Sequence, residues 1–298
     1  MTTASDAVGA TFEAERPRLV ALAYRMLGTV DEAEDVVQDA WLRWSAVDRA
    51  AIAEPAAWLT TVTTRLAIDR LRSARQRREV YVGPWLPEPV ADAGDPFDAA
   101  ASAESLTLQF LTVLERLDPV ERAVLLLHDV FGYPFAEVAA HVDRTEATAR
   151  QIAKRARERV RSGRPVVEPP PDRATAERLA EAFFAAVAVG DVEALKALLT
   201  DDVVHLSDGG PTRRAARRPV TGPDRVARLF LNLASRTRPG TRFDPVLVNG
   251  QPAWYATVDG EPEILFVPSF RGGRVASVLA VLNPDKLARF HAAWLAQQ

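Results

Sequence analysis

The sequence predicts a multidomain chain: two all-α helical domains followed by an α+β domain with the shape of a cone. Two proline-bearing segments, 77–103 and 163–172, interrupt the helical patterns. After the second segment come strand-like runs with Asn-Gly, Asp-Gly and Gly-Gly turn signals. The expected divisions are helical domains at 6–76 and 104–164, a linker at 77–103, a proline-rich spacer at 165–173 and the α+β domain at 174–298.

Composition limits the classes of protein that the chain can belong to. It has 298 residues, a formal net charge of −3 and no cysteine. Without cysteine there are no disulfides, thiolate zinc sites or cysteine nucleophiles. No apolar run is long enough to span a bilayer and there is no signal peptide, so we expect a cytoplasmic protein without membrane contact. The charge is uneven, because 31–39 is acidic and 150–164 is densely basic.

Residues 31–44, DEAEDVVQDAWLRW, predict an amphipathic helix with a negative face. Its apolar side is expected to comprise Ala33, Val36, Val37, Ala40 and Trp41. Its acidic face is expected to comprise Asp31, Glu32, Glu34, Asp35 and Asp39.

Residues 57–72, AWLTTVTTRLAIDRLR, predict a second helix with an unusual surface. The expected core stripe is Trp58, Leu59, Val62 and Leu66, while Ile68 and Leu71 lie off it and indicate packing on more than one side. The remaining surface carries Thr60, Thr61, Thr63, Thr64, Arg65, Arg70 and Arg72. Threonines are poor choices for a solvated helix face, whereas threonines and arginines near indoles suit single-stranded nucleic acid. A plain amphipathic helix with basic ends is the alternative.

The second helical block has the pattern of a helix-turn-helix. An amphipathic helix is expected from 106 to Asp118-Pro119, an apolar helix from 120 to Gly132, and a short helix after Pro134. Thr145 is expected to cap a final basic helix. Side chains near the start of such a helix meet base edges, and later arginines hold phosphates. The candidates for base contacts are Thr145, Thr148, Arg150, Gln151, Lys154 and Arg155. A helical hairpin with merely solvated arginines is the alternative.

The last domain combines helices with a curved antiparallel sheet. Helices are expected at 174–189, ending at Gly190, from Asp191 to 199, at 224–234 and at 284–296; strands are expected at 203–206, 243–248, 252–258, 263–270 and 274–282. His205 and Asp208 are the nearest acid–base candidates for a cavity in such a cone. The simpler alternative places His205 at a strand edge and Asp208 in a turn with its glycines. The scattered histidines suggest no metal site.

The acidic helix, the loop with Pro55 and the threonine-arginine helix together resemble region 2 of bacterial sigma factors of the extracytoplasmic-function (ECF) group. The match runs from about 12 to 75 and includes LVALAYRMLG at 19–28. The resemblance implies docking on the β′ clamp helices of core RNA polymerase through Asp35, Val36, Gln38, Asp39 and Trp41. It implies melting and recognition of the promoter minus-10 element through Trp58, Thr61, Thr64, Arg65, Asp69, Arg70 and Arg72.

Residues 117–142 resemble sigma region 4, which reads the minus-35 element and touches the polymerase β flap. The following segment, RTEATARQIAKRARERV, departs from the commonest ECF pattern. The resemblance therefore carries no base preference to this chain.

The tail resembles a SnoaL-like domain of the nuclear transport factor 2-like fold, which a subgroup of ECF sigma factors carries. Three motifs mark that subgroup, a WLPEP-type linker, a DGG-type loop and an NPDKL-type end. They stand here as Trp85, Leu86, Pro87, Glu88 and Pro89; Asp208, Gly209 and Gly210; and Asn283, Pro284, Asp285, Lys286 and Leu287. Pro211 replaces the usual third glycine. The resemblance implies that the domain regulates the sigma factor, and that the motifs contact one another or the DNA-binding domains.

The expected function is therefore that of a sigma factor, with no catalytic residue, cofactor or metal. Its expected partners are core RNA polymerase and duplex and melted promoter DNA, and a small ligand in the tail is a further candidate. The acids Glu88, Asp92, Asp95 and Asp98 are hypothesised to imitate nucleic acid in the polymerase cleft. Two alternatives stay open: a stand-alone helix-turn-helix regulator, and a bifunctional protein whose tail is a ligand-binding or cyclase/isomerase-like domain.

Overall fold

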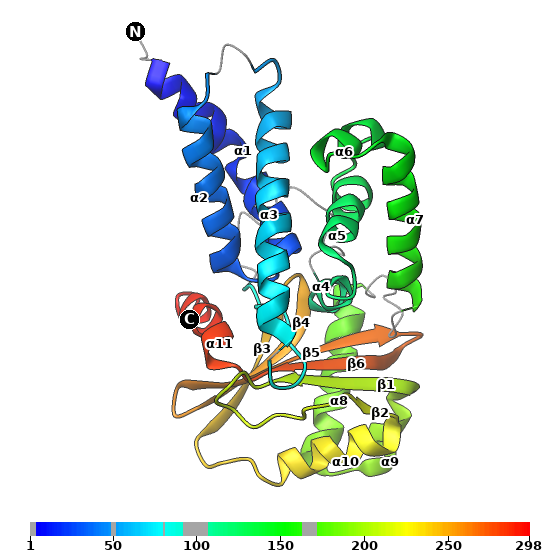
Figure 1. Ribbon diagram of the computed structural model, residues 1–298. Coiled ribbons are helices and arrows are strands. Elements are labelled where there is room, and N and C mark those ends of the chain that lie inside the picture. Colours follow the sequence, from blue (N-terminus) through cyan, green and yellow to red (C-terminus); the bar gives the residue numbers. More distant parts are fainter. Residues whose placement is uncertain (1–3, 49–51, 80, 92–106, 163–171) are drawn as a thin grey trace. The chain divides into compact units, whose positions relative to one another are not determined.

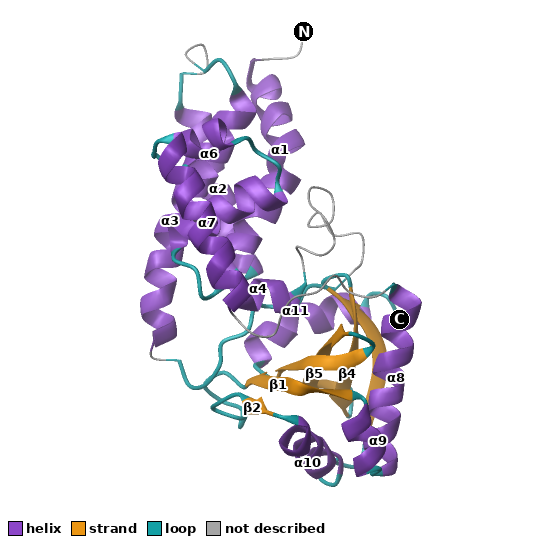
Figure 2. Cartoon of the chain, turned by 90° about the vertical axis from the view of Figure 1, so that its right-hand side faces the viewer, coloured by secondary structure: helices purple, strands orange, loops and turns teal. Residues whose placement is uncertain are grey.

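The computed structural model describes residues 4–48, 52–79, 81–91, 107–162 and 172–298 (Figures 1 and 2). They fall into two compact units. The first contains 4–48, 52–79 and 113–162, and the second contains 81–91, 107–112 and 172–298. The five divisions expected from the sequence are finer than these units and stay predictions. Most of the proline-rich spacer, and Asp92, Asp95 and Asp98, lie outside the described residues.

The first unit begins with three long helices, α1 (Ala4–Leu27), α2 (Val30–Ala46) and α3 (Pro55–Glu79). In α2 the predicted apolar side is largely confirmed, because Ala33, Val36, Val37 and Ala40 are buried. Trp41 lies at the margin of that side, where its ring packs against Phe12 with centroids 4.9 Å apart.

Helix α3 packs on more than one side, as its sequence predicts. It contacts α1 and α2, and also the later helices α5 and α6. The predicted stripe is wrong in detail: Leu59 is buried, but Trp58, Val62 and Leu66 are only partly buried. The buried residues that the stripe missed are Thr60, Thr63, Thr64, Ala67, Ile68, Leu71 and Ala74.

A second group of helices completes the first unit. It comprises α5 (Pro119–Leu125), the π-helix η4 (Leu126–Val130), α6 (Phe135–His141) and α7 (Glu146–Ser162), preceded by α4 (Leu108–Leu114), which begins in the second unit. Asp118 and Glu121 form a reciprocal capping box at α5. The predicted cap of α7 is confirmed, because Thr145 Oγ1 accepts the backbone N–H of Thr148 at 3.2 Å.

The second unit is built around a six-stranded sheet with the order β2-β1-β6-β5-β4-β3. The strands are β1 (Leu199–Asp208), β2 (Val220–Thr221), β3 (Thr241–Val248), β4 (Gln251–Val258), β5 (Glu261–Arg271) and β6 (Arg274–Val281). The predicted hairpin turns are confirmed; Asn249 and Gly250, for example, have φ of 52° and 73°. The sheet is not wholly antiparallel, because β1 and β6 pair in parallel. Turn signals reveal only hairpins between consecutive strands, so the sequence could not predict this pairing.

Helices and the linker cover opposite faces of this sheet (Figure 1). On one face lie α8 (Arg173–Val189), α9 (Val192–Ala197) and α10 (Pro223–Ala234). Their aromatic core includes Phe183 and Phe230. On the other face, α11 (Pro284–Leu295) and the linker pack through Leu86, Leu287 and Phe290. Two of the three sequence motifs, the WLPEP linker and the NPDKL end, therefore meet on this second face.

Candidate nucleic-acid interface

The acidic face of α2 is open to solvent. Asp35, Gln38 and Asp39 are exposed and Trp41 is partly exposed, but Val36 is buried in the helical core. Val36 therefore packs in the core beneath the exposed face of α2 and is not itself accessible to a partner in this structure. A negative, exposed stripe of this kind suits a basic partner surface.

The threonine face of α3 is not free, contrary to the sequence prediction. Thr60, Thr63 and Thr64 are buried, and Thr61 is partly buried. Thr61 Oγ1 lies 2.7 Å from His141 Nδ1 of α6, and Arg18 of α1 donates to Thr60 Oγ1 at 2.8 Å. Protein rather than solvent therefore covers the surface expected to hold melted DNA.

The basic side chains of α3 are also engaged. Arg70 donates to Asp35 at 2.5 Å, and Arg72 donates to Asp69 at 2.9 Å. Arg65 is exposed and donates weakly, at 3.3 Å, to the Ala140 carbonyl. Of the predicted minus-10 residues, Trp58 is partly buried and packs against Trp44 with ring centroids 5.6 Å apart.

His141 is a neutral contact at the centre of this arrangement. Burial, followed by the nearby charges of Arg18 and Arg65, lowers its pKa from 6.5 to about 4. Its Nε2 is buried and has no hydrogen-bond partner among the described residues. Protonation would place an uncompensated charge between α3 and α6, so this contact requires the neutral ring.

A buried polar network joins helices α1 and α3 to the second group of helices, which begins with α5. Arg122 of α5 is 1% exposed and donates to Met26 O at 2.6 Å, to Leu114 O at 3.1 Å and to Glu115 at 2.5 Å. Arg78 of α3 donates to the same carboxylate and to Leu27 O. Burial opposes ionisation of Glu115, but the two guanidinium groups outweigh it and lower the pKa of the carboxyl.

The predicted base-contact residues of α7 form an open surface. Thr145, Thr148, Arg150, Gln151, Lys154 and Arg155 are all exposed. Arg150 pairs with Glu146 and lies 4.7 Å above the Phe135 ring, so it is held in one place. Of the later arginines, Arg157 pairs with Asp129 and Arg159 with Glu121, and their phosphate contacts stay a prediction. These pairs fasten α7 to its own domain.

The three motifs of the second unit meet at one buried carboxylate, which confirms that they contact one another. Asp208 Oδ2 accepts the backbone N–H of Leu86 at 2.9 Å and lies 2.7 Å from Lys286 Nζ. Lys286 also donates to the Leu86 carbonyl, and its ammonium lies 4.0 Å from the centre of the Trp85 ring. The Asp208 carboxylate further accepts Tyr81 O–H at 2.5 Å, and burial together with Asp208 raises the pKa of that phenol.

The other motif residues fix the backbone around this carboxylate. Gly210 has φ of 61°, and a Cβ there would stand 2.7 Å from Asn283 Cγ. Asn283 caps α11 by accepting the N–H of Asp285 at 3.1 Å. Among the remaining motif residues, Pro87, Pro89 and Leu287 are buried and Pro284 is the first residue of α11. Gly209 lies against the Arg213 carbonyl.

The position of Glu88 contradicts the hypothesis that this residue imitates nucleic acid. Its side chain is 8% exposed and lies 3.7 Å from the Arg289 guanidinium. A buried, paired carboxylate presents no charge to a distant partner, so Glu88 does not act as a nucleic-acid mimic in this structure.

The acid–base candidates of the tail do not form a pair. Side chains alternate along β1, so His205 lies with the Phe230 face and Asp208 with the α11 face. Burial lowers the pKa of His205 to about 4, and its Nδ1 has no partner among the described residues. His205 pairs with Val220 of β2 and Val278 of β6 inside the sheet, so the predicted position at a strand edge is wrong. The turn predicted for Asp208 is confirmed by its bond from Gly210 N–H at 3.0 Å.

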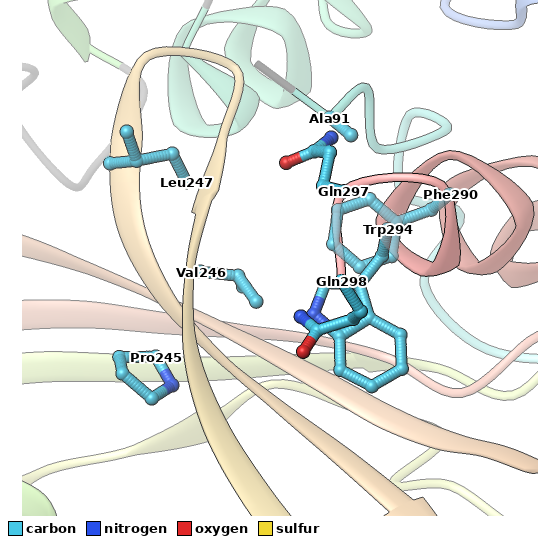
Figure 3. Close-up of a pocket in the computed structure, with 8 residues that line it drawn as sticks. All are labelled: Ala91, Pro245, Val246, Leu247, Phe290, Trp294, Gln297 and Gln298. Carbon is cyan, nitrogen blue, oxygen red and sulfur yellow. The ribbon is translucent and has the colours of Figure 1, made fainter. Parts of the chain in front are cut away.

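A cavity of about 190 Å³ lies between β3 and the end of α11 (Figure 3). Its walls are Ala91, Pro245, Val246, Leu247, Phe290, Trp294, Gln297 and Gln298. These side chains carry no charge, so they offer a ligand little beyond apolar contact and two amides. Within the described ranges, no three histidine or acidic residues group as metal ligands, and no helix has both the length and the hydropathy for a membrane crossing.

Two residues of the polar networks described above, Arg122 and Tyr81, could have been suspected from the sequence. Arg122 is a lone arginine in the apolar run VERAVLLL, and Tyr81 stands four residues before the WLPEP motif. A charge inside an apolar run indicates a buried network. His141 and Glu115 carry no comparable signal, because their partners are distant in the chain.

Comparison with known proteins gives a consistent assignment. The family models for Sigma-70 region 2, Sigma-70 region 4 and the SnoaL-like domain match residues 11–78, 107–160 and 180–281. The chain is 44% identical to "ECF RNA polymerase sigma factor SigJ" of Mycobacterium tuberculosis over 92% of this chain and 91% of that protein. It is 33% identical to "Probable ECF RNA polymerase sigma factor SigI" of the same species, covering 95% of each. The crystal structure of SigJ aligns with a TM-score of 0.76 and 39% identity, covering 94% of this chain and 98% of that one.

Proposed function

This chain belongs to the ECF RNA polymerase sigma factors that carry a SnoaL-like domain, and we propose how its surfaces divide the work of initiation. The exposed stripe of Asp35, Gln38 and Asp39 docks on the β′ clamp helices of core RNA polymerase. The α3 helix holds the melted minus-10 element, and the start of α7 enters the major groove at the minus-35 element. Region 4 also touches the β flap.

The observation that carries this proposal is the exposed acidic stripe of α2. A stand-alone helix-turn-helix regulator has no need of an acidic docking surface beside its DNA-binding helices. The exposure of the six candidate base-contact side chains of α7 supports the minus-35 role, because these side chains already lie at the surface.

Because the threonine face of α3 is covered, the sigma factor itself has to open before α3 can hold melted DNA. Thr60 and Thr61 cannot meet extruded bases while Arg18, Tyr133 and His141 lie against them. Core polymerase therefore has to separate α3 from α6 before the minus-10 element is held. The free chain is a closed form of the sigma factor.

The test compares α3 and α7 variants in the holoenzyme. Arg65→Ala should reduce promoter opening, measured by permanganate reactivity of unpaired thymines, while leaving binding to a minus-35 duplex nearly unchanged. Lys154→Ala should do the reverse. Equal and modest effects of both variants on both measurements would show that these are only solvated charges.

The SnoaL-like domain regulates this activity through the docked linker. The buried contacts of Leu86, Asp208 and Lys286 support this role, because they tie the segment between regions 2 and 4 to the C-terminal domain. Run-off transcription by the full chain and by a chain ending after Arg164 tests it. Equal transcript yields would contradict a regulatory role. An enzymatic tail finds less support, since His205 and Asp208 face opposite sides of the sheet.

A further inference from the structure

The C-terminal domain contains an arginine-rich segment whose arginine side chains take no part in the contacts described above. Residues 211–242 contain nine arginines and a single acidic residue, Asp224. The whole chain has a formal net charge of −3, so this positive charge is local. Such a concentration of one sign creates a field that attracts anions.

Some of these arginines are neutralised within the domain. Arg213 and Arg238 share the Glu263 carboxylate, and Arg242 pairs with Asp244 at 3.0 Å. Five others are exposed and form no ion pair with any described residue, namely Arg214, Arg217, Arg218, Arg225 and Arg236.

The loop from β1 to β2 holds three of these arginines on a fixed backbone. Ala216 N–H donates to Ser207 Oγ at 2.9 Å, and Arg213 N–H donates to Gly209 O at 3.0 Å. The Cα of Arg217 lies so near Gly83 that a Cβ on that glycine would stand 3.4 Å from it. A backbone fixed in advance lowers the entropy cost of binding.

We propose that the exposed arginines of the β1–β2 loop, Arg214, Arg217 and Arg218, form a second DNA-binding surface. It takes the phosphates of duplex DNA without reading sequence. Guanidinium groups bind phosphate oxygens through two parallel hydrogen bonds, and a duplex repeats its charge at short intervals. The loop carries no exposed large apolar side chain. Protein–protein interfaces usually bury an apolar or aromatic anchor, so the loop suits a nucleic acid better than a protein partner.

The test uses the full chain and a fluorescent duplex of roughly 30 base pairs with random sequence. Binding is followed by anisotropy between about 50 and 200 mM salt. The variant R214Q/R217Q/R218Q should lose affinity by about tenfold or more, and its plot of log affinity against log salt should be shallower by about 2 to 3. The variant R214K/R217K/R218K keeps the charge and should keep the slope.

A matched control removes the same charge elsewhere on the domain. R178Q/R242Q/R274Q changes exposed arginines of α8, β3 and β6 and should bind the duplex almost as the wild-type chain does. Equal losses in both triple variants would overturn the proposal. So would unchanged DNA affinity with weaker binding to core polymerase, which would assign the loop to an acidic protein surface. Either failure leaves the sigma-factor proposal intact, because random duplex without polymerase does not test initiation.

Discussion

Lys286 and Asp208 form a buried ion pair in which Nζ lies 2.7 Å from Oδ2, with the side chains 8% and 0% exposed. The same ammonium group donates to the Leu86 carbonyl and lies over the Trp85 ring. One cation at the start of α11 therefore joins the end of β1 to the linker.

Replacing Lys286 by Met should destabilise the chain and release the linker. Asp208 would remain buried without its cation, so we expect the free energy of unfolding to fall by about 3–5 kcal/mol. Urea unfolding of the full chain measures this loss, and limited proteolysis should cut 81–91 faster. The control Lys196→Met removes a partly exposed ammonium paired with the exposed Asp224 and should change both readouts little. Similar effects from the two variants would contradict the role of the buried pair.

Acid should weaken the folded state through two buried histidines. His141 and His205 have a pKa of about 4 in the folded chain, against 6.5 for an unperturbed imidazole. The unfolded chain binds the extra protons first, so stability falls as the pH drops from about 6.5 toward 4. Urea midpoints at about pH 7 and pH 5 test this. His141→Gln and His205→Gln should each show a smaller drop than the wild-type chain, and an unchanged drop in both would refute the assignment.

Holding α3 and α6 together should block initiation. The chain has no cysteine, so Thr61→Cys with His141→Cys provides a unique pair for a short, cleavable bis-maleimide. We expect the crosslinked chain to lose transcription by about tenfold or more, because the crosslink holds the closed state and the open state can no longer be populated. Reductive cleavage of the reagent should restore the activity of the uncrosslinked double variant. A crosslinked chain as active as the cleaved one would exclude the opening requirement.

The buried Arg122 should be essential for joining the two groups of helices in the first unit. Arg122→Met leaves the Met26 carbonyl without its donor and weakens the pairing of Glu115, so we expect about 3 kcal/mol of lost stability. The exposed Arg116 offers a matched control, and Arg116→Met should change the urea midpoint little. A midpoint in Arg122→Met that equals that of the control would show that the network does not stabilise the unit.

Local chemistry made much of the fold predictable. Thr145 and Asp191 cap their helices, Gly190 ends α8 with φ of 79°, and Asn249-Gly250 forms a hairpin turn, because each depends on residues nearby in the chain. The parallel pairing of β1 with β6 depends on residues far apart in the chain, so local turn signals do not predict it.

The candidate site was predicted less completely for the same reason. The threonines of α3 indicate an unusual surface, but the side chains that cover it, such as His141, stand 80 positions away. A predicted strand of 203–206 was also too short to reveal that His205 and Asp208 face opposite sides. The resemblance to the subgroup predicts that the three motifs contact one another. The Lys286–Asp208 ion pair that joins them is visible only in the structure.

The most direct measurement of the central claim is run-off transcription on fragmented genomic DNA of the source organism, with core RNA polymerase and sequencing of transcript starts. The full chain should direct core enzyme to a defined set of starts sharing minus-35 and minus-10 elements. Asp35→Lys with Asp39→Lys should abolish these transcripts together with binding to core enzyme. Transcripts no different from those of core enzyme alone would contradict the account.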